Sequence, residues 1–587
     1  MASPVALAVT GLRCEHLVDP LAVDTPTPRL SWQLASADRG VRQHAYQIIV
    51  ASTPECLAAG YGDVWDSGIV ESDETLLIAY GGPPLTTGQE VVWSVRSVAS
   101  GSPWSAFSAP ARWRTGVMDA TDWTADWVGS PRLLEAATPT AGRPGVLLRH
   151  EFELPAAPRR AVALVSALGA YDLHVNGERV GDDVLAPEWT DYDRRIQYQA
   201  IDVTGYLGRG ANAIGALVAD GWFAGRLGHV LLGADDPVRG FYGDRVALLL
   251  QLDIDLVDGT RVRINTDENW RTSVEGPLVQ ACLMDGEHWD ARREQPGWDR
   301  PAHDDASWLP AAIVNAPTGH LVAQRNEPIR PARPITPIAS SEPAPGRHVF
   351  DLGQNIAGRV RLRGRGVAGR PVTVRHGEML QPDGTLYREN LRFDRGGGHG
   401  AAATDVYVPA RDGDVEWEPR FTYHGFRFVE VEGLDGDPGL LTVTGVPTHS
   451  DVAFDSSIET SDPQLNRLLD NASWTLRGNL HGIPTDCPQR DERLGFLGDM
   501  LAFGQSACFT AGMGAFFTKW LADVRAVQTA DVEHLDRRPP AGRSRRRRRD
   551  RGRCECYVRS SRRTRASIRG TGSRSSRKAS HSRPARD

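Results

Sequence analysis

The stretch that decides the fold of this chain is DCPQRDERLGFLGD, residues 486–499, because it lies where strand patterns have given way to helical ones. It holds four carboxylates and two arginines in fourteen residues. Charged side chains are rarely buried unless they are paired, and dense clusters of them often mark a functional site. The alternative is a solvated loop whose charges form local ion pairs between two helices.

Helical patterns flank the charged stretch on both sides. Asp462 is placed to cap a helix that has Pro463 at its first position. The apolar residues expected on one face of this helix are Leu465, Leu468, Leu469, Ala472 and Leu476. Two more helices are predicted over Met500–Ala511 and Ala515–Ala530. Their apolar positions cover much of the helix surface, so we expect these helices to sit inside a larger helical assembly.

Three blocks of strand pattern precede the helices. Residues 1–116 contain the period-two alternation of Val91–Val98, which favours a small immunoglobulin-like or fibronectin III-like sandwich. Residues 117–330 hold many short strands and an Asn176–Gly177 turn between two of them, which indicates an antiparallel jelly roll. Residues 331–450 are predicted to form a third β-domain.

Composition narrows the class of protein. Seven cysteines, odd in number and widely spaced, form neither a disulfide framework nor a metal-ligand pattern. No run approaches the roughly 20 apolar residues of a membrane span, and Met1–Val9 lacks the basic region of a signal peptide. We therefore expect a cytoplasmic protein that does not associate with membranes.

The last part of the chain differs in composition from the rest. Residues 537–587 carry 19 Arg and one Lys against three acidic residues, whereas the whole chain has a net charge of −7. Such a segment cannot bury enough apolar surface to fold. One reading is a disordered arm that binds nucleic acid. The reading that we favour is a shifted reading frame near Asp531–Leu535, so a nucleic-acid partner is not expected despite the basic tail.

Paired carboxylates like those of residues 486–499 are the working groups of glycoside hydrolysis, in which one acts as general acid. Arg490 and Arg493 can hold neighbouring carboxylates ionised. A carboxyl in a drier position can remain protonated and donate its proton. Phe496 and Trp474 could supply the apolar wall on which a sugar stacks.

The string of residues 486–499 resembles the active-site signature of the bacterial α-L-rhamnosidases, glycoside hydrolase family 78. Further resemblance to this family lies in the β-blocks, at Phe350–Gly358, Phe421–Phe428, Leu173–Gly177 and Ala186–Tyr192. It covers about residues 10–531 in the family's order of domains. The implied ligands are rhamnosylated small molecules or oligosaccharides, and no cofactor is required.

The resemblance implies a role for each residue of the signature. Glu492 would be the general acid that protonates the glycosidic oxygen. The substrate-binding residues would be Asp486, Arg490, Asp491, Phe496, Asp499 and Trp474. Phe496 stands where the family usually has a tryptophan.

The family inverts the anomeric centre, so a second carboxylate activates water from the opposite face of the sugar. That residue is a glutamate much further along the helical domain, and no position of this chain matches it. Most of the family's (α/α)6 toroid is also without a counterpart here. We therefore expect a catalytic domain that is cut short, with little or no activity for the chain as given.

In some relatives the jelly-roll domain binds rhamnose through Ca²⁺. The candidate residues for such a second site are Asn176, Asp191 and Asp193 as oxygen ligands, with Trp189 and Trp222 as stacking faces. The alternative is that Asn176 serves the turn and the aspartates cap loops. No metal site is assigned, and the alternative function is that of a non-catalytic carbohydrate-binding protein.

The predicted fold is multidomain and mainly β, followed by the first helices of a toroid. Its parts are a fibronectin III-like sandwich at 1–116, a jelly roll at 117–330, a β-sandwich at 331–450, an incomplete (α/α)6 domain at 451–535 and a disordered or frame-shifted tail at 536–587.

Overall fold

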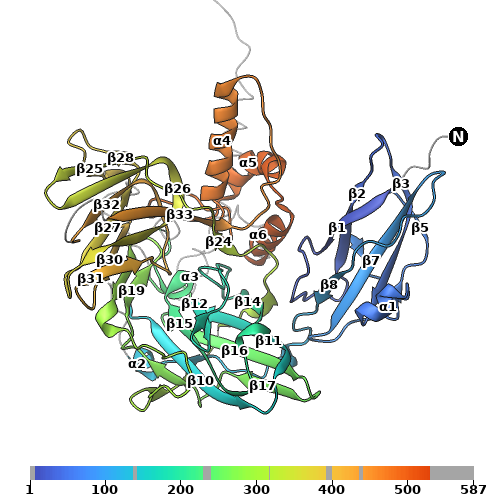
Figure 1. The fold of residues 1–587 in the computed structure, drawn as a ribbon, viewed down its shortest axis with the longest axis horizontal. Helices are drawn as coiled ribbons and strands as arrows, with labels where there is room; N and C mark the ends of the chain where they lie inside the picture. The colour runs from blue at the N-terminus through green and yellow to red at the C-terminus, as the bar shows by residue number, and fades with distance from the viewer. Residues whose placement is uncertain are drawn as a thin grey trace, which may run out of the picture.

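The computed structural model of the chain describes residues 7–135, 142–228, 239–315, 317–391, 400–434 and 441–528. The basic tail predicted at 536–587 lies outside these ranges. Strands dominate the architecture up to residue 450 and three helices follow, which confirms the predicted fold class (Figure 1). No helix in the described ranges is long and apolar enough to cross a membrane.

The N-terminal domain is a sandwich of two small sheets. Its first sheet has the order β1-β2-β6 and its second β4-β3-β7-β8, with β5 paired to β3. Trp32, Trp93 and Trp113 are buried between the sheets because successive side chains of a strand alternate between its two faces. The elements are β1 Ala8–Cys14, β2 Arg29–Ala35, β3 Gln43–Ala51, α1 Pro54–Ala58, β4 Trp65–Asp66, β5 Val70–Glu71, β6 Ile78–Ala79, β7 Glu90–Ala99 and β8 Ala111–Arg114.

The second domain also consists of two sheets, ordered β13-β12-β15-β10-β18-β21 and β22-β9-β16-β11-β14-β23, with β17 on β16. Asn176 and Gly177 join β12 to β13 with φ values of 52° and 86°, as the predicted hairpin turn requires. The strands are β9 Val128–Gly129, β10 Val146–Leu154, β11 Pro158–Leu168, β12 Ala170–Val175, β13 Glu178–Arg179, β14 Arg195–Asp202, β15 Gly210–Ala219, β16 Ala247–Leu256, β17 Arg261–Asn265, β18 Arg271–Ser273, β21 Leu309–Pro310, β22 Ala312–Ile313 and β23 His320–Ala323. Two short helices accompany them, α2 Pro131–Glu135 and α3 Gly221–Ala224.

The third domain is built on a sheet ordered β19-β20-β30-β27-β32-β26-β33-β24, with β25 and β31 paired to β26. Its strands β19 and β20 come from the segment predicted as jelly roll, yet His288 of β20 pairs with Val406 of β30. The strands are β19 Leu278–Cys282, β20 Gly286–Asp290, β24 Ile329–Pro331, β25 Ala339–Ala344, β26 Arg347–Gly366, β27 Val372–Gly377, β28 Met379–Leu380, β29 Leu386–Tyr387, β30 Thr404–Val408, β31 Gly413–Trp417, β32 His424–Glu432 and β33 Thr442–Ser450. The two β-domains thus share a hairpin.

Three helices end the described chain: α4 Pro463–Gly478, α5 Leu497–Thr510 and α6 Gly514–Ala526. Asp462 caps α4 through its side chain, as predicted. Of the apolar residues expected on one face of this helix, Leu476 is buried but Leu468 is 62% exposed. The N-terminal half of the predicted face therefore lies in solvent, since Leu465 is also exposed, at 42%.

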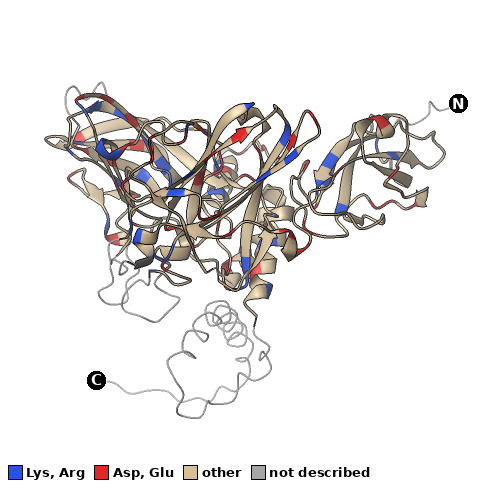
Figure 2. Cartoon of the chain, turned by 90° about the horizontal axis from the view of Figure 1, so that it is seen from below, with Lys and Arg blue, Asp and Glu red and all other residues tan. Residues whose placement is uncertain are grey.

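The helices sit on the two larger β-domains (Figure 1). The buried Lys519 of α6 donates hydrogen bonds to the carbonyl oxygens of Trp189 and Gly482 and pairs with Asp523 at 2.8 Å. Arg195 of the jelly roll reaches the same Asp523 at 3.0 Å. Figure 2 shows Lys and Arg interleaved with Asp and Glu over the described sheets, so the body presents charges of both signs.

Candidate active site

The charged stretch forms a closed loop between α4 and α5. The backbones of Asp486 and Leu494 exchange two hydrogen bonds, each 2.8 Å from nitrogen to oxygen. Because the loop closes in this way, Cys487 Sγ and one carboxylate oxygen each of Asp486 and Glu492 lie within 4.8 Å of one another. One short segment therefore assembles most of the candidate site.

Glu492 occupies a dry position beside a cation and is only 7% exposed. Arg490 donates from Nη2 to its Oε2 at 2.6 Å, and Cys487 Sγ lies 3.6 Å from the same oxygen. Burial raises the pKa of Glu492 and the charge of Asp486 adds to this, while Arg490 opposes it. The result is a carboxyl that keeps its proton to a higher pH than an exposed glutamate, as a general acid must.

The other predicted sugar-binding residues lie at the ends of the helices. Asp499 is exposed in the first turn of α5, and burial followed by the charge of Asp486 raises its pKa. Phe496 is the N-cap residue of α5 and packs against the jelly-roll core. Trp474 lies on α4 and lines a cleft together with Asp486. The loop and the start of α5 thus hold Asp486, Glu492 and Asp499 near one another, while Trp474 meets the loop at the cleft.

Asp491 was predicted to bind substrate, but its side chain is turned into the protein and is 2% exposed. Its charge acts on Arg226 of the jelly roll. Burial lowers the pKa of Arg226, whereas Asp285 and more weakly Asp491 raise it above its usual value. The burial of Asp491 and its interaction with Arg226 therefore suit a residue that anchors the loop on the jelly roll. They do not suit a group that is open to a sugar.

Arg493 ties the loop to the β-domains and was not predicted to do so. It is buried at a φ of 44° and donates to the carbonyl oxygens of Leu283, of Tyr423 at 2.7 Å and of Arg490 at 3.2 Å. Its guanidinium carbon lies 4.8 Å from the centre of the Tyr423 ring, which in turn stacks on His481. The carbonyl oxygens and the Tyr423 ring thus hold this buried guanidinium and fix the loop on the β-domains.

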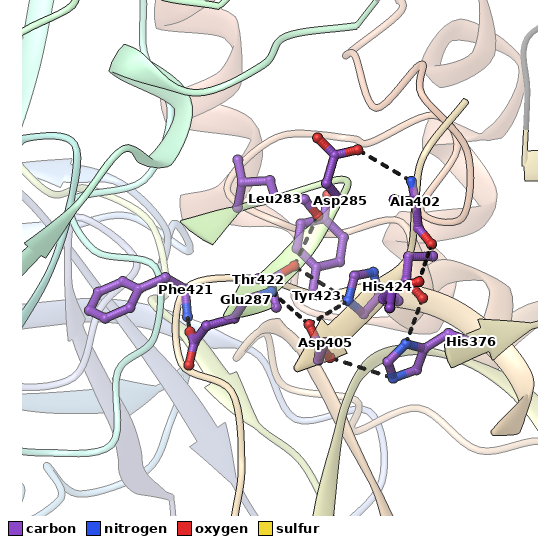
Figure 3. Close-up of polar contacts among 12 residues, drawn as sticks. Leu283, Asp285, Glu287, His376, Ala402, Asp405, Phe421, Thr422, Tyr423 and His424 are labelled. Atoms are coloured by element: carbon purple, nitrogen blue, oxygen red, sulfur yellow. Dashed lines mark hydrogen bonds and ion pairs between the residues drawn. The ribbon is translucent and has the colours of Figure 1, made fainter. Parts of the chain in front are cut away.

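A buried polar network supports the segment that receives Arg493 (Figure 3). Glu287 accepts hydrogen bonds from the backbone nitrogens of Arg420 at 2.8 Å and Phe421 at 2.9 Å. Asp405 accepts from the backbone nitrogen of Glu287 at 2.8 Å and contacts His424 Nε2 at 3.3 Å. The strand end that carries Tyr423 is therefore fixed on both sides by buried carboxyl groups.

Two glycines let the β-domains approach the loop at backbone distance. A Cβ on Gly228 would collide with the carbonyl oxygen of Glu492. A Cβ on Gly425 would come within 2.8 Å of the backbone nitrogen of Gln489. Only glycine permits such close approach without a shift of the backbone, so both β-domains touch the loop that carries the candidate acid.

Two groups of described side chains have the composition of metal ligands. The first, His376, Asp405 and His424, is fully buried in the network of Figure 3. Burial, with a smaller contribution from His424, lowers the pKa of His376 to about 3, so this imidazole is neutral. The second group is that of Asp486, Cys487 and Glu492, where the guanidinium of Arg490 already contacts the thiol and Glu492. At the loop, the positive charge is thus supplied by an arginine.

Most of the residues predicted for a second sugar or calcium site take part in the hydrogen bonding and packing of the jelly roll itself. Asn176 donates to Tyr206 O and Asn212 Oδ1 and accepts from Ala213 N, so both polar atoms of its amide tie the turn to residues 206–213. Trp189 and Trp222 are buried in the jelly-roll core, and neither presents an open face for stacking. Asp191 is buried and Asp193 is half-buried. Calcium binding by the aspartates stays a prediction.

Four family models match consecutive parts of the chain. They are described as a Rha78A-like N-terminal immunoglobulin domain (residues 9–119), an alpha-L-rhamnosidase N-terminal domain (156–333), a bacterial alpha-L-rhamnosidase concanavalin-like domain (341–449) and a bacterial alpha-L-rhamnosidase 6 hairpin glycosidase domain (454–544). The last of these contains the charged loop.

Relatives along the whole described chain agree with these models. The chain is 35% identical to an alpha-L-rhamnosidase of Streptomyces avermitilis, over 92% of this chain and 66% of the relative. It is also 35% identical to one of Formosa agariphila, over 88% of this chain and 54% of the relative.

Solved structures give the same result in three dimensions. The crystal structure of the S. avermitilis enzyme complexed with L-rhamnose matches with a TM-score of 0.83 and 35% identity, covering 90% of this chain and 65% of that one. An alpha-L-rhamnosidase from Dictyoglumus thermophilum matches with a TM-score of 0.82 and 35% identity, covering 89% and 58%. The chain thus spans between about half and two thirds of the length of these relatives.

Proposed function

This chain belongs to the bacterial α-L-rhamnosidases, and we propose on that basis that it acts on terminal, non-reducing α-L-rhamnose in glycosides or polysaccharides. The observation that carries the proposal is the environment of Glu492. A glutamate that is 7% exposed, has a raised pKa and is held by Arg490 has the properties of a general acid.

In the proposed reaction Glu492 donates its proton to the glycosidic oxygen as the bond from that oxygen to the anomeric carbon breaks. Water attacks the anomeric carbon from the opposite face, and a second carboxylate takes the proton that water releases. The hydroxyls of rhamnose are held by Asp486 and Asp499, while Phe496 covers an apolar part of the ring.

Asp486 does not suit the role of the second carboxylate. One of its oxygens lies within 4.8 Å of an oxygen of Glu492 on the same loop, whereas inverting enzymes keep the two carboxyl groups about 6.5–9.5 Å apart with water between them. We propose that the base is the distant glutamate implied by the family resemblance. Without a matching residue in this chain, general base catalysis would be lost, which typically contributes about 10²–10⁴-fold to the rate.

The test is hydrolysis of nitrophenyl α-L-rhamnoside by residues 1–587, with the anomer of the released sugar identified by NMR at early times. The proposal expects slow release of the β-anomer, and still slower release by a Glu492→Gln variant. Release of the α-anomer first would contradict inversion, and fast turnover would contradict the weak activity. Binding of rhamnose that is never followed by hydrolysis would favour the alternative, a non-catalytic carbohydrate-binding protein.

A further inference from the structure

A cleft of about 530 Å³ separates α4 from the edge of the third domain, beside the charged loop. Figure 1 shows α4 rising next to β26 and β33 at this point. The volume falls in the range of sites for small ligands. Asp486 and Cys487 belong to its lining, but Glu492, Phe496 and Asp499 do not. The cleft is therefore a neighbour of the proposed rhamnose site and shares one wall with it.

One wall of the cleft is a polar face of α4. Residues spaced by three and four along a helix share a face, and here these are Asp470, Asn471, Trp474 and Thr475. Asn471 is exposed and Trp474 is half-buried. The helix thus presents an indole ring and an amide together, at a place where an interface between domains would ordinarily be apolar.

The opposite wall comes from an irregular point in β26. The pairing of β26 with β32 shifts between Asp351 and Ile356, which leaves Gln354 and Asn355 outside the ladder. Asn355 donates to Glu378 Oε1 at 2.7 Å, which orients that carboxylate. Gln354 is half-buried and Asn355 is exposed, so this wall presents side-chain amides at the cleft.

The cleft has no surplus of positive charge, since its lining holds two arginines against the three carboxylates of Glu378, Asp470 and Asp486. Of its arginines, Arg427 is held by both oxygens of Asp351 at 2.7 Å, and Arg467 pairs with Asp470 at 3.1 Å. Phosphate or carboxylate ligands need a free cation, and these guanidinium groups are already engaged. Amides, carboxylates and one aromatic ring instead suit a neutral ligand with many hydroxyl groups.

We propose that this cleft binds the sugar to which the terminal rhamnose is attached, so that the third domain helps to select the substrate. The inference rests on the proposed function. It follows from position as well as chemistry: Cys487 Sγ in the wall of the cleft is 3.6 Å from Glu492 Oε2, and the general acid must face the oxygen that joins rhamnose to the next sugar. Trp474 stacks on the ring of that sugar, and Gln354, Asn355 and Asn471 bond its hydroxyls.

The experiment is calorimetric binding of two probes to the full chain, methyl α-L-rhamnoside and an α-L-rhamnosyl-glucose disaccharide, from a panel of linkages. The proposal expects the disaccharide of one linkage to bind about tenfold more tightly, since two or three added hydrogen bonds suffice for this. Asn471→Ala should remove most of the gain and leave the affinity for the methyl rhamnoside unchanged, and Trp474→Ala should also remove most of the gain. Trp104→Ala, a half-buried tryptophan of the N-terminal domain, is the matched control.

The outcomes separate this inference from the function on which it rests. Equal affinity for both probes, with every linkage, overturns the cleft as a sugar site and leaves the rhamnose site standing. A loss of both affinities in the Asn471→Ala variant, whose exposed position does not threaten folding, also overturns it. Disaccharide binding that depends on Trp474, without any binding of the methyl rhamnoside, supports the cleft and contradicts the rhamnose site. Binding of neither probe overturns both.

Discussion

At the scale of single residues, the site depends on how one carboxyl is kept protonated beside a guanidinium. Burial acts on Glu492 in one direction and Arg490 in the other, and burial prevails. Because Arg490 also holds the carboxyl in place at 2.6 Å, position and proton affinity are set by the same neighbour. Changes at these two residues should therefore have separable effects.

Replacing Glu492 with glutamine should remove hydrolysis and spare binding. Glutamine keeps the shape and the contact with Arg490, but it has no proton to donate, so any rate the chain shows should fall by about 10²–10⁴-fold. The loss should be larger for an alkyl rhamnoside than for a nitrophenyl rhamnoside, whose leaving group needs little protonation. Calorimetry should give an unchanged affinity for methyl α-L-rhamnoside, and an equal loss with both substrates would place the acid elsewhere.

Replacing Arg490 with glutamine should shift the pH profile upward. A general acid works in its protonated form, so activity is lost as the pH rises through its pKa. Arg490 lowers the pKa of Glu492, and without it the alkaline limb of kcat/KM should move to higher pH. The exposed Arg525 supplies a control variant with the same change of charge. A limb that stays in place would mean that another group sets it.

The residues of the candidate site differ in how far the sequence could predict them. Asp486 and Glu492 meet because one short loop closes, so a contiguous motif contains both of them. The partners of Arg493, Leu283 and Tyr423, come from distant segments and carry no periodic signal. The burial of Asp491 could not be predicted from the sequence either, because it arises only when the loop docks on the jelly roll.

At the scale of elements, the helices show that the sequence can predict where a helix starts without predicting which of its faces is buried. The start of α4 is fixed by Asp462 and Pro463, both local features, and was predicted correctly. The burial of its apolar face depends on neighbours, and Leu468 is instead 62% exposed. Similar exposure affects α5, with Leu501 at 77% and Phe509 at 73%.

These exposed apolar side chains should make the chain prone to association. Exposed apolar surface marks an interaction surface or an aggregation hazard. Changing Leu468, Leu501 and Phe509 together to glutamine should therefore raise solubility and lower the binding of a hydrophobic dye. The unfolding temperature should change little, since the three side chains contribute little burial. A marked loss of stability would mean that they are covered in solution.

A methyl group at Gly228 should disturb the catalytic loop from the side of the jelly roll. The Gly228→Ala Cβ would collide with Glu492 O, and a displacement of about 1 Å of a catalytic group can cost about 10²-fold in rate. We expect a fall in kcat and weaker rhamnose binding, with the jelly roll still folded. Gly208→Ala, in the same domain and facing open space, is the control. Normal activity in the Gly228 variant would show that the loop can yield.

At the scale of the whole molecule, the domains share elements rather than simply touching. The β19–β20 hairpin leaves the jelly roll to complete the third sheet, a long-range pairing for which period-two patterns hold no information. Glu287 of β20 lies beneath the strand end that holds Arg493 and hence the loop. A buried carboxyl therefore links the stability of the β-body to the geometry of the site.

That carboxyl should also make the protein less stable as the pH rises. Burial raises the pKa of Glu287 to about 7, despite the hydrogen bonds from Phe421 and Arg420. In the unfolded chain it ionises near its ordinary value, so between pH of about 4.5 and 7 the folded state binds more protons and the free energy of unfolding falls. At about 1.4 kcal/mol per pKa unit, this one group can account for up to about 3 kcal/mol.

Replacing Glu287 with glutamine should remove this part of the pH dependence. Its side-chain oxygen can still accept the two backbone hydrogen bonds, and no ionised form exists to be penalised. The unfolding temperature of the wild type should drop more between pH 5 and pH 8 than that of the variant, so that the variant is the more stable protein at pH 8. The same change at the exposed Glu389 should leave the wild-type slope unaltered. Parallel curves for wild type and Glu287→Gln would mean that water or a local opening already lets Glu287 ionise in the folded state, and the support for the loop would then have to come from Asp405 and the neutral histidines behind it.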